Sequence, residues 1–213
     1  MPVPLPTMCA VLAHELRSPL SVIQGYIRLL QRQRDAGHPE AAMLDAMLDA
    51  TGRLTGIARQ ASDLGAWLTG PGAAPLPAHR VSEVAARLAG RFGADSPIAA
   101  TVHPVSAAVG DQLLRCDPPA LVDALSAVVN ALHREAGGAP VEIALADPEA
   151  TGAVTVRLQA HGQGHARPFS FERGGSGLAL VTASHVLTAH GAIVEPAAGD
   201  DLTITFPHTG GIQ

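Results

Sequence analysis

Apolar residues in the first third of the chain recur at the spacing of a helix. They predict one amphipathic helix over residues 8–34 and a second over residues 41–68. Between the two, Gly37 and Pro39 are stop and restart signals. Two long helices joined by so short a link must lie antiparallel, as a hairpin. Because a single hairpin cannot cover its own apolar stripes, we expect two copies to form a four-helix bundle and therefore a homodimer.

Beyond the hairpin, the pattern of apolar positions alternates between helix and strand. Residues 71–79 are rich in proline, glycine and alanine, which is typical of a linker. Helical patterns then cover 81–92, 118–136 and 178–190, and strand patterns cover 98–102, 141–146, 153–160 and 202–206. Helices on one side of a mixed sheet form an α+β sandwich. We therefore predict a hairpin domain over 1–70, a linker over 71–79 and a sandwich domain over 80–213.

Composition and charge narrow the classes of function. The net charge of −5, from 19 acidic and 14 basic residues, gives no basic field, so we expect no nucleic-acid partner. The two cysteines, Cys9 and Cys116, form no metal or redox motif, which indicates a reduced, cytoplasmic protein. No apolar run approaches the ~20 residues of a membrane span, and the N-terminus lacks the basic region of a signal peptide. We expect no metal site and no membrane insertion.

His14 and Glu15 stand side by side in the first predicted helix, and Pro19 follows five residues after the histidine. A histidine exposed on a helix can attack phosphorus through one ring nitrogen while a neighbouring carboxylate assists at the other. Pro19 lacks the N–H that would bond to the carbonyl of Glu15, so the helix should bend there and leave space for a docking protein. The alternative is a solvent-facing His-Glu pair on a structural hairpin, because both residues are common on helix surfaces.

The string HELRSPL at residues 14–20, followed by SVIQGYIRLL, closely resembles the H-box of sensor histidine kinases. The resemblance implies that His14 is the phosphorylated residue, that Glu15 is its acid-base partner, and that Pro19 kinks the first helix of a dimeric four-helix bundle. It also implies that Ser18 occupies the place where the family often positions a water for phosphatase activity. The implied partner is the receiver domain of a response regulator, docked beside His14.

The last third of the chain resembles the same family. Residues 174–195 look like its second glycine box and the helix that follows. Gly175 and Gly177 would let the backbone approach phosphates at a helix N-terminus. The resemblance therefore implies that residues 80–213 form a kinase-like ATP-binding sandwich, with Mg-ATP as cofactor if the nucleotide site is functional.

The first glycine box departs from the family's pattern. In AHGQGH at residues 160–165, Gly162 and Gly164 match the box, but Ala160 stands where the family has an aspartate that reads the adenine amino group. A methyl group cannot accept that hydrogen bond. Losing a buried charged acceptor costs ~1.5–3 kcal/mol, roughly tenfold to over a hundredfold in affinity.

The Mg²⁺-binding asparagines are also altered. The family's ungapped register, read from Asp117, puts Ala127 and Ala131 where two asparagines are expected. Asn130 falls one residue short, about 100° around the helix, and would hold Mg²⁺ only if a residue had been deleted. The segment 165–174 is also short for an ATP lid. Three features with which the family binds nucleotide, namely the aspartate that reads adenine, the asparagines that hold Mg²⁺ and the ATP lid, are therefore weakened together.

Three hypotheses follow. The first is a dimeric histidine phosphotransferase, similar to those derived from kinases, that uses His14 to carry phosphoryl groups between response regulators and has weakened or lost ATP binding. Nothing like a sensor or membrane segment precedes the H-box, which suits such a relay better than a receptor. The second is an active ATP-dependent kinase that phosphorylates its own His14. The third is a pseudokinase that regulates a partner by binding it.

Overall fold

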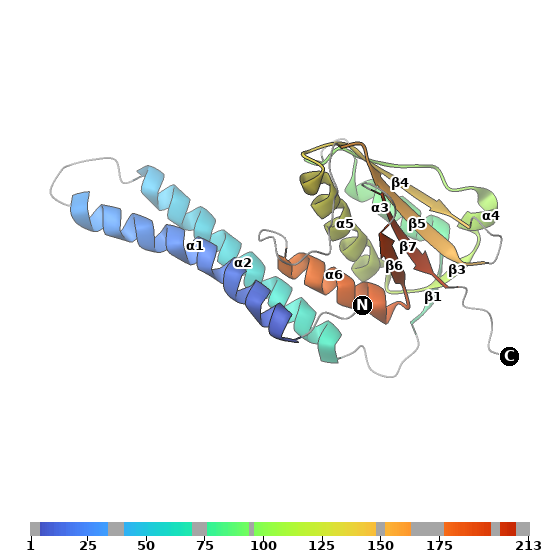
Figure 1. Ribbon diagram of the computed structural model, residues 1–213, viewed down its shortest axis with the longest axis horizontal. Helices are drawn as coiled ribbons and strands as arrows, with labels where there is room; N and C mark the ends of the chain where they lie inside the picture. The colour runs from blue at the N-terminus through green and yellow to red at the C-terminus, as the bar shows by residue number, and fades with distance from the viewer. Residues whose placement is uncertain are drawn as a thin grey trace.

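Two long helices form an antiparallel hairpin at the N-terminal end of the molecule (Figure 1). The computed structural model describes residues 5–33, 41–69, 76–93, 96–147, 152–162, 177–196 and 201–207. Helix α1 spans Leu5–Gln33 and helix α2 spans Ala41–Thr69. The helices predicted over 8–34 and 41–68 are confirmed. Among the described helices, none is long and apolar enough to cross a membrane.

The rest of the chain folds into a sandwich of helices and strands. In chain order its elements are β1 (Ala78–Arg80), α3 (Val81–Arg91), β2 (Ala100–Val102), α4 (Ala107–Gly110), β3 (Leu113–Arg115), α5 (Pro118–Glu135), β4 (Val141–Ala146), β5 (Val154–Ala160), α6 (Gly177–Ala189), β6 (Ile193–Pro196) and β7 (Asp201–Phe206). Strand β1 begins inside the segment predicted as a linker. It pairs antiparallel with β3 in a small two-stranded sheet.

The main sheet has five strands in the order β2-β4-β5-β7-β6. Strands β2 and β4 are parallel and all other neighbours are antiparallel, so the sheet is mixed. Buried and less buried residues alternate strictly along β4, β5 and β7, because only one face of the sheet packs against the helices. Figure 1 shows that helices lie on that one face. The predicted helical hairpin followed by an α/β sandwich is therefore confirmed.

Local sequence explains where the central helices begin and end. At the start of α5 the Asp117 carboxylate accepts a hydrogen bond from the backbone N–H of Ala120 (3.1 Å), and Pro118 occupies the first helical position. Helix α6 ends just before Gly191, whose φ of 71° lies in the left-handed region that glycine favours. These signals fix the start of the helix that carries Asn130 and the end of the helix that begins at Gly177.

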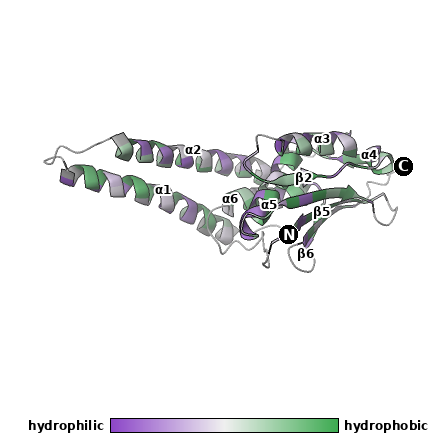
Figure 2. Ribbon diagram, turned by 90° about the horizontal axis from the view of Figure 1, so that it is seen from above, coloured by the Kyte–Doolittle hydropathy of each residue, from purple (hydrophilic) through white to green (hydrophobic). Residues whose placement is uncertain are grey.

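Helix α6 lies between the hairpin and the sandwich (Figure 2). One side of it packs against α5, and another packs against α1 and α2. Its sequence, GLALVTASHVLTA, is apolar on nearly every side, as expected of a helix buried all round. Trp67, near the end of α2, packs against the sandwich core and contacts the ring of His190. It therefore lies at the junction of the two parts.

Candidate functional site

His14 lies on α1 with its side chain exposed to solvent. Glu15 is half-buried, and Ser18 is exposed one turn further along the helix. Because residues four apart share a helix face, Ser18 is on the same side of α1 as His14, while Glu15 flanks that side. The helix therefore presents an accessible imidazole, with the carboxylate of the adjacent Glu15 and, one turn further along, the hydroxyl of Ser18.

Pro19 lies inside α1, which continues through it to Gln33. The proline ring is buried, although its neighbours Ser18 and Leu20 are exposed. Helix α1 follows a curved path in Figure 1. The missing N–H of Pro19 explains curvature of this kind, since it removes one hydrogen bond of the helical ladder next to the H-box.

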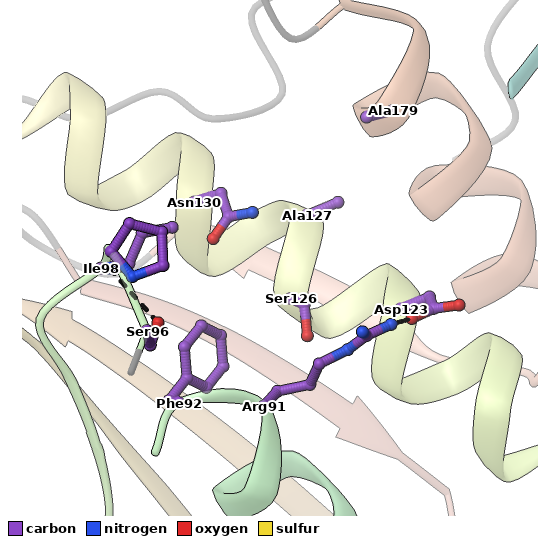
Figure 3. A pocket seen from close by; sticks show the side chains of 10 residues that line it. Arg91, Phe92, Ser96, Ile98, Asp123, Ser126, Ala127, Asn130 and Ala179 are labelled. Carbon is purple, nitrogen blue, oxygen red and sulfur yellow. Dashed lines mark hydrogen bonds and ion pairs between the residues drawn. The ribbon is translucent and has the colours of Figure 1, made fainter. Parts of the chain in front are cut away.

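A hollow of about 350 Å³ opens between the end of α3, the outer face of α5 and the first turn of α6 (Figure 3). Asn130 and Ala127 both line it. Ala131, the other position where the register predicts an asparagine, is completely buried in the core instead. Asn130 is thus the one asparagine that faces this hollow. An ion pair between Arg91 and Asp123 lies along its edge.

Strand β5 ends at Ala160, and Gly162 follows it in the first glycine box. Ala160 is buried in the core, and it pairs with Val141 in the sheet. A Cβ added to Gly162 would lie 2.7 Å from the carbonyl oxygen of Ala136 and 2.8 Å from its Cβ. Gly162 is therefore in close contact with the end of α5. Gly164 lies outside the described residues.

Gly177 begins α6 at the second glycine box, and its side that lacks a Cβ faces the hairpin. A Cβ added there would lie 2.5 Å from Cγ1 of Val11 on α1. Gly177 is buried. Gly175 lies outside the described residues. The two described glycines of the predicted phosphate-binding boxes are thus both packed against other parts of the same chain.

Two groups of interacting side chains that contain histidine, and that the sequence did not predict, lie near these residues. His190 accepts a hydrogen bond at Nε2 from the backbone N–H of Asp117 (3.0 Å), and its Nδ1 lies 2.6 Å from the carbonyl oxygen of Val186. Burial lowers the pKa of His190, so the neutral ring is favoured. No local motif signals this contact, because Asp117 and His190 meet only through the tertiary fold.

The second cluster lies at the sheet edge, just before the first glycine box. The Nε2 atoms of His103 and His161 lie 3.3 and 3.1 Å from the carboxylate of Glu142. Hydrogen bonds from His161 and His103 lower the pKa of Glu142. Within the described ranges, no group of three or more side chains is arranged to hold a metal ion. The two histidines thus share a carboxylate at the point where β5 leads into the glycine-rich segment.

Comparisons with known proteins agree with this arrangement. Residues 7–66 match the His Kinase A (phospho-acceptor) domain family. No curated protein matches the chain in sequence.

Solved structures extend the similarity to both parts of the chain. The histidine kinase AdeS of Acinetobacter baumannii has a similar structure, with a TM-score of 0.67 and 15% identity over 92% of this chain and 98% of that one. Full-length ShkA, solved with AMPPNP, has a TM-score of 0.53 and 19% identity over 93% of this chain and 45% of that one. At these identities the likeness establishes the fold. Residues 7–66 thus match the phospho-acceptor domain family of histidine kinases, and the chain as a whole, a helical hairpin followed by an ATPase-like sandwich, shares the fold of a histidine kinase.

Proposed function

We propose that the chain is a histidine phosphotransfer protein, in which His14 carries a phosphoryl group to or from the aspartates of response regulators. The main supporting observation is the exposed His14, on a helix that matches the phospho-acceptor domain family. Glu15 and Ser18 lie beside it and are the polar groups expected to assist. A receiver domain would dock against α1 next to His14, where Pro19 removes one backbone hydrogen bond of the helix.

The chemistry needs only the hairpin and the receiver. The unprotonated ring nitrogen of His14 attacks the phosphorus of a phosphoaspartate, so an N–P bond forms while the P–O bond of the acyl phosphate breaks. The aspartate leaves as a carboxylate. The imidazole ring becomes positively charged, and Glu15 stabilises it by accepting the proton, or a hydrogen bond, from the other ring nitrogen. The reverse sequence returns the phosphoryl group to a second receiver.

Weakened nucleotide binding forms part of the proposal. The described residues do not fit a bound nucleotide well, because Ala160 cannot accept a hydrogen bond from adenine and is itself core. A Cβ at Gly162 or at Gly177 would overlap protein atoms, so packing within the chain accounts for both glycines without a bound phosphate. Loss of these contacts favours a relay over a kinase.

A dimer of hairpins is the assembly that we propose. Large apolar side chains on α1 and α2 remain exposed in the single chain: Leu20, Ile27, Leu29, Leu44, Leu48 and Leu68. Exposed apolar side chains concentrated on one hairpin mark an interaction surface. Pairing with a second hairpin would cover them in a four-helix bundle.

One observation favours the kinase alternative. Asn130 faces the hollow between α3, α5 and α6 beside Ala127 (Figure 3), within one helical turn of the position where the family holds Mg²⁺. If this amide replaces the expected asparagine, Mg-ATP could still bind and phosphorylate His14.

Two labelled donors separate the relay from the kinase. The purified protein is incubated either with labelled Mg-ATP or with a receiver domain that carries a labelled phosphoryl group. The relay predicts acid-labile label only from the receiver, and His14→Gln should abolish it. Label from Mg-ATP alone would establish the kinase instead. Absence of label from both donors, together with tight receiver binding, would favour the pseudokinase.

A further inference from the structure

A second hollow, of about 590 Å³, opens where helix α2 of the hairpin faces helices α5 and α6 of the sandwich. It adjoins the hollow of Figure 3 and shares with it the ion pair of Arg91 and Asp123. Its volume is within the range of about 300–1,000 Å³ that is typical of small-molecule sites, which occur preferentially where two parts of a protein meet. We refer to this space, lined by Gln60, Asp63 and Trp67 of α2 and by the facing residues of α5 and α6, as the α2 hollow.

Small side chains keep the α2 hollow open on the side of the sandwich. Five alanines line it there: Ala120, Ala124 and Ala127 of α5, and Ala179 and Ala183 of α6. They recur at spacings of three and four residues, so each helix presents a face of methyl groups to the hollow. Methyl groups offer a ligand apolar contact area, and they leave room that larger aliphatic side chains would fill. The hollow can therefore accommodate an apolar body between the helices.

Trp67 is the aromatic residue of the α2 hollow. Its indole is half-buried, and the ring of His190 lies against it with the two ring centroids 5.7 Å apart. Burial lowers the pKa of His190, so at neutral pH this neighbouring ring carries no positive charge. The face of an indole attracts cations, because the electrons of the ring give it a negative potential. The aromatic wall therefore favours a positively charged ligand.

Carboxylates predominate among the charged groups around the α2 hollow. Asp63, Asp117 and Asp123 line it, together with one guanidinium, that of Arg91. The guanidinium is paired with Asp123, and the carboxylate of Asp117 caps the start of α5. Asp63 is exposed, and among the described residues it has no hydrogen-bond or ion-pair partner. Asp63 therefore provides a negative charge that no side chain of the described ranges neutralises.

We propose that the α2 hollow binds an organic ammonium ion with an apolar body. Asp63 and Trp67 are four residues apart on α2, so the carboxylate and the indole lie on the same face of the helix. Gln60, three residues before Asp63, adds an amide oxygen that can accept a hydrogen bond from an ammonium group. The charged end of the ligand would then lie against α2, and its apolar body against the alanines of α5 and α6.

This site differs from a nucleotide site in the sign of its charge. Three carboxylates against one guanidinium leave the lining with a net charge of −2, which repels the phosphates of a nucleotide and attracts a cation. Neither His14 nor a described glycine of the nucleotide boxes lines the hollow. Binding of the ammonium ion is therefore independent of the phosphotransfer role proposed above and can be measured without a phosphoryl donor.

Three probes of similar size and different charge test the proposal on the full chain: 2-phenylethylammonium, 2-phenylethanol and phenylacetate. Trp67 is the only tryptophan, so its indole N–H gives a single NMR signal that reports the hollow. The cation should shift this signal saturably at millimolar concentrations or below, and the neutral alcohol should bind about threefold to fivefold more weakly. Phenylacetate should give no saturable shift. Added salt should weaken binding of the cation alone.

Paired variants separate charge from space. Asp63→Asn should weaken the cation about threefold to fivefold and leave the alcohol unchanged. Asp49→Asn is its control, because this carboxylate is also exposed on α2 and does not line the hollow. Ala120→Leu should weaken both the cation and the alcohol by filling the hollow, whereas Ala86→Leu, at an exposed position of α3, should affect neither.

Several results would overturn the proposal. One is the absence of a saturable shift with the cation, and another is equal binding of the cation and the alcohol. Equal effects of Asp63→Asn and Asp49→Asn would exclude the carboxylate of Asp63 as the ligand's partner. A shift produced by Mg-ATP and not by the cation would assign the hollow to a nucleotide instead. Because Asp63→Asn changes an exposed side chain, the test holds even if Ala120→Leu does not fold.

Discussion

Replacing Gly162 with alanine tests whether the first glycine box is maintained by packing. The new Cβ would lie 2.7 Å from the carbonyl oxygen of Ala136, whereas ordinary contacts begin at 3.4 Å. The end of β5 or of α5 must therefore move by about 0.7 Å. The obstacle is backbone, so no side-chain rotation can relieve it.

The magnitude follows from two opposing effects. Overpacking of a well-packed site costs about 1–3 kcal/mol. Removing a glycine from the unfolded chain stabilises by about 0.4–1 kcal/mol where the backbone conformation allows alanine, and Gly162 is not among the positive-φ glycines. The midpoints leave a net destabilisation of about 1.3 kcal/mol. For a sandwich of this size, that lowers the melting temperature by about 4–6 °C.

The assay is thermal denaturation of the nucleotide-free protein, followed by circular dichroism and calorimetry. Gly90→Ala is the control, because its Cβ would meet nothing within 4 Å and it lies inside helix α3. That control should stabilise by up to about 1 kcal/mol. If Gly162→Ala were as stable as the Gly90→Ala control, packing against Ala136 would not explain the glycine.

Three further predictions concern stability, reactivity and assembly. Burial lowers the pKa of His190 in the folded protein, so the unfolded chain binds a proton on this ring more tightly. The stabilisation from the neutral ring should therefore be fully present above pH 6.5 and be lost as the pH falls below it. His190→Gln should flatten this acid limb in thermal melts between pH 7.5 and 5, and an unchanged limb would exclude His190 as its source. Burial raises the pKa of the Cys116 thiol to about 11, so the reactive thiolate is scarce in the folded protein. In a Cys9→Ser variant, a thiol reagent should therefore modify Cys116 only as fast as the protein unfolds. Rapid labelling of the native protein would contradict this. Leu48→Glu, at a side chain 69% exposed on α2, should weaken dimerisation in sedimentation equilibrium, whereas Leu113→Glu, 58% exposed on the sandwich, should not; equal effects would argue against the hairpin interface.

The sequence predicted most of the fold because strong periodicity marks long elements. The two helices of the hairpin and helix α5 have repeated apolar positions and clear end signals, and their bounds agree with the structure to within a few residues. The short elements β1, α4 and β3 were not predicted, since three or four residues carry no readable period. Strand β1 is defined by its pairing with β3, which joins Ala78 to Arg115.

The site was predictable only where a contiguous motif carries it. HELRSPL predicts the proposed phosphotransfer residues His14 and Glu15 from neighbouring residues alone, and the structure leaves His14 exposed. The contact between Val11 and Gly177 joins residues far apart in the chain and depends on how α6 docks. Asn130 was predicted to lie about 100° around α5 from the family's position, yet it faces the same hollow as Ala127, because residues three apart share a helix face.

Direct localisation of a phosphoryl group on His14 tests the central claim most directly. The wild-type protein, His14→Gln and the exposed-histidine control His103→Gln are each incubated with a phosphorylated receiver domain. They are then analysed by phosphorus NMR at alkaline pH and by mass spectrometry of the peptide that contains residue 14. The relay predicts a phosphohistidine signal in the wild type and in His103→Gln, and none in His14→Gln. A signal that persists in His14→Gln, or no transfer to the wild type from any receiver that binds it, would contradict the phosphotransfer function.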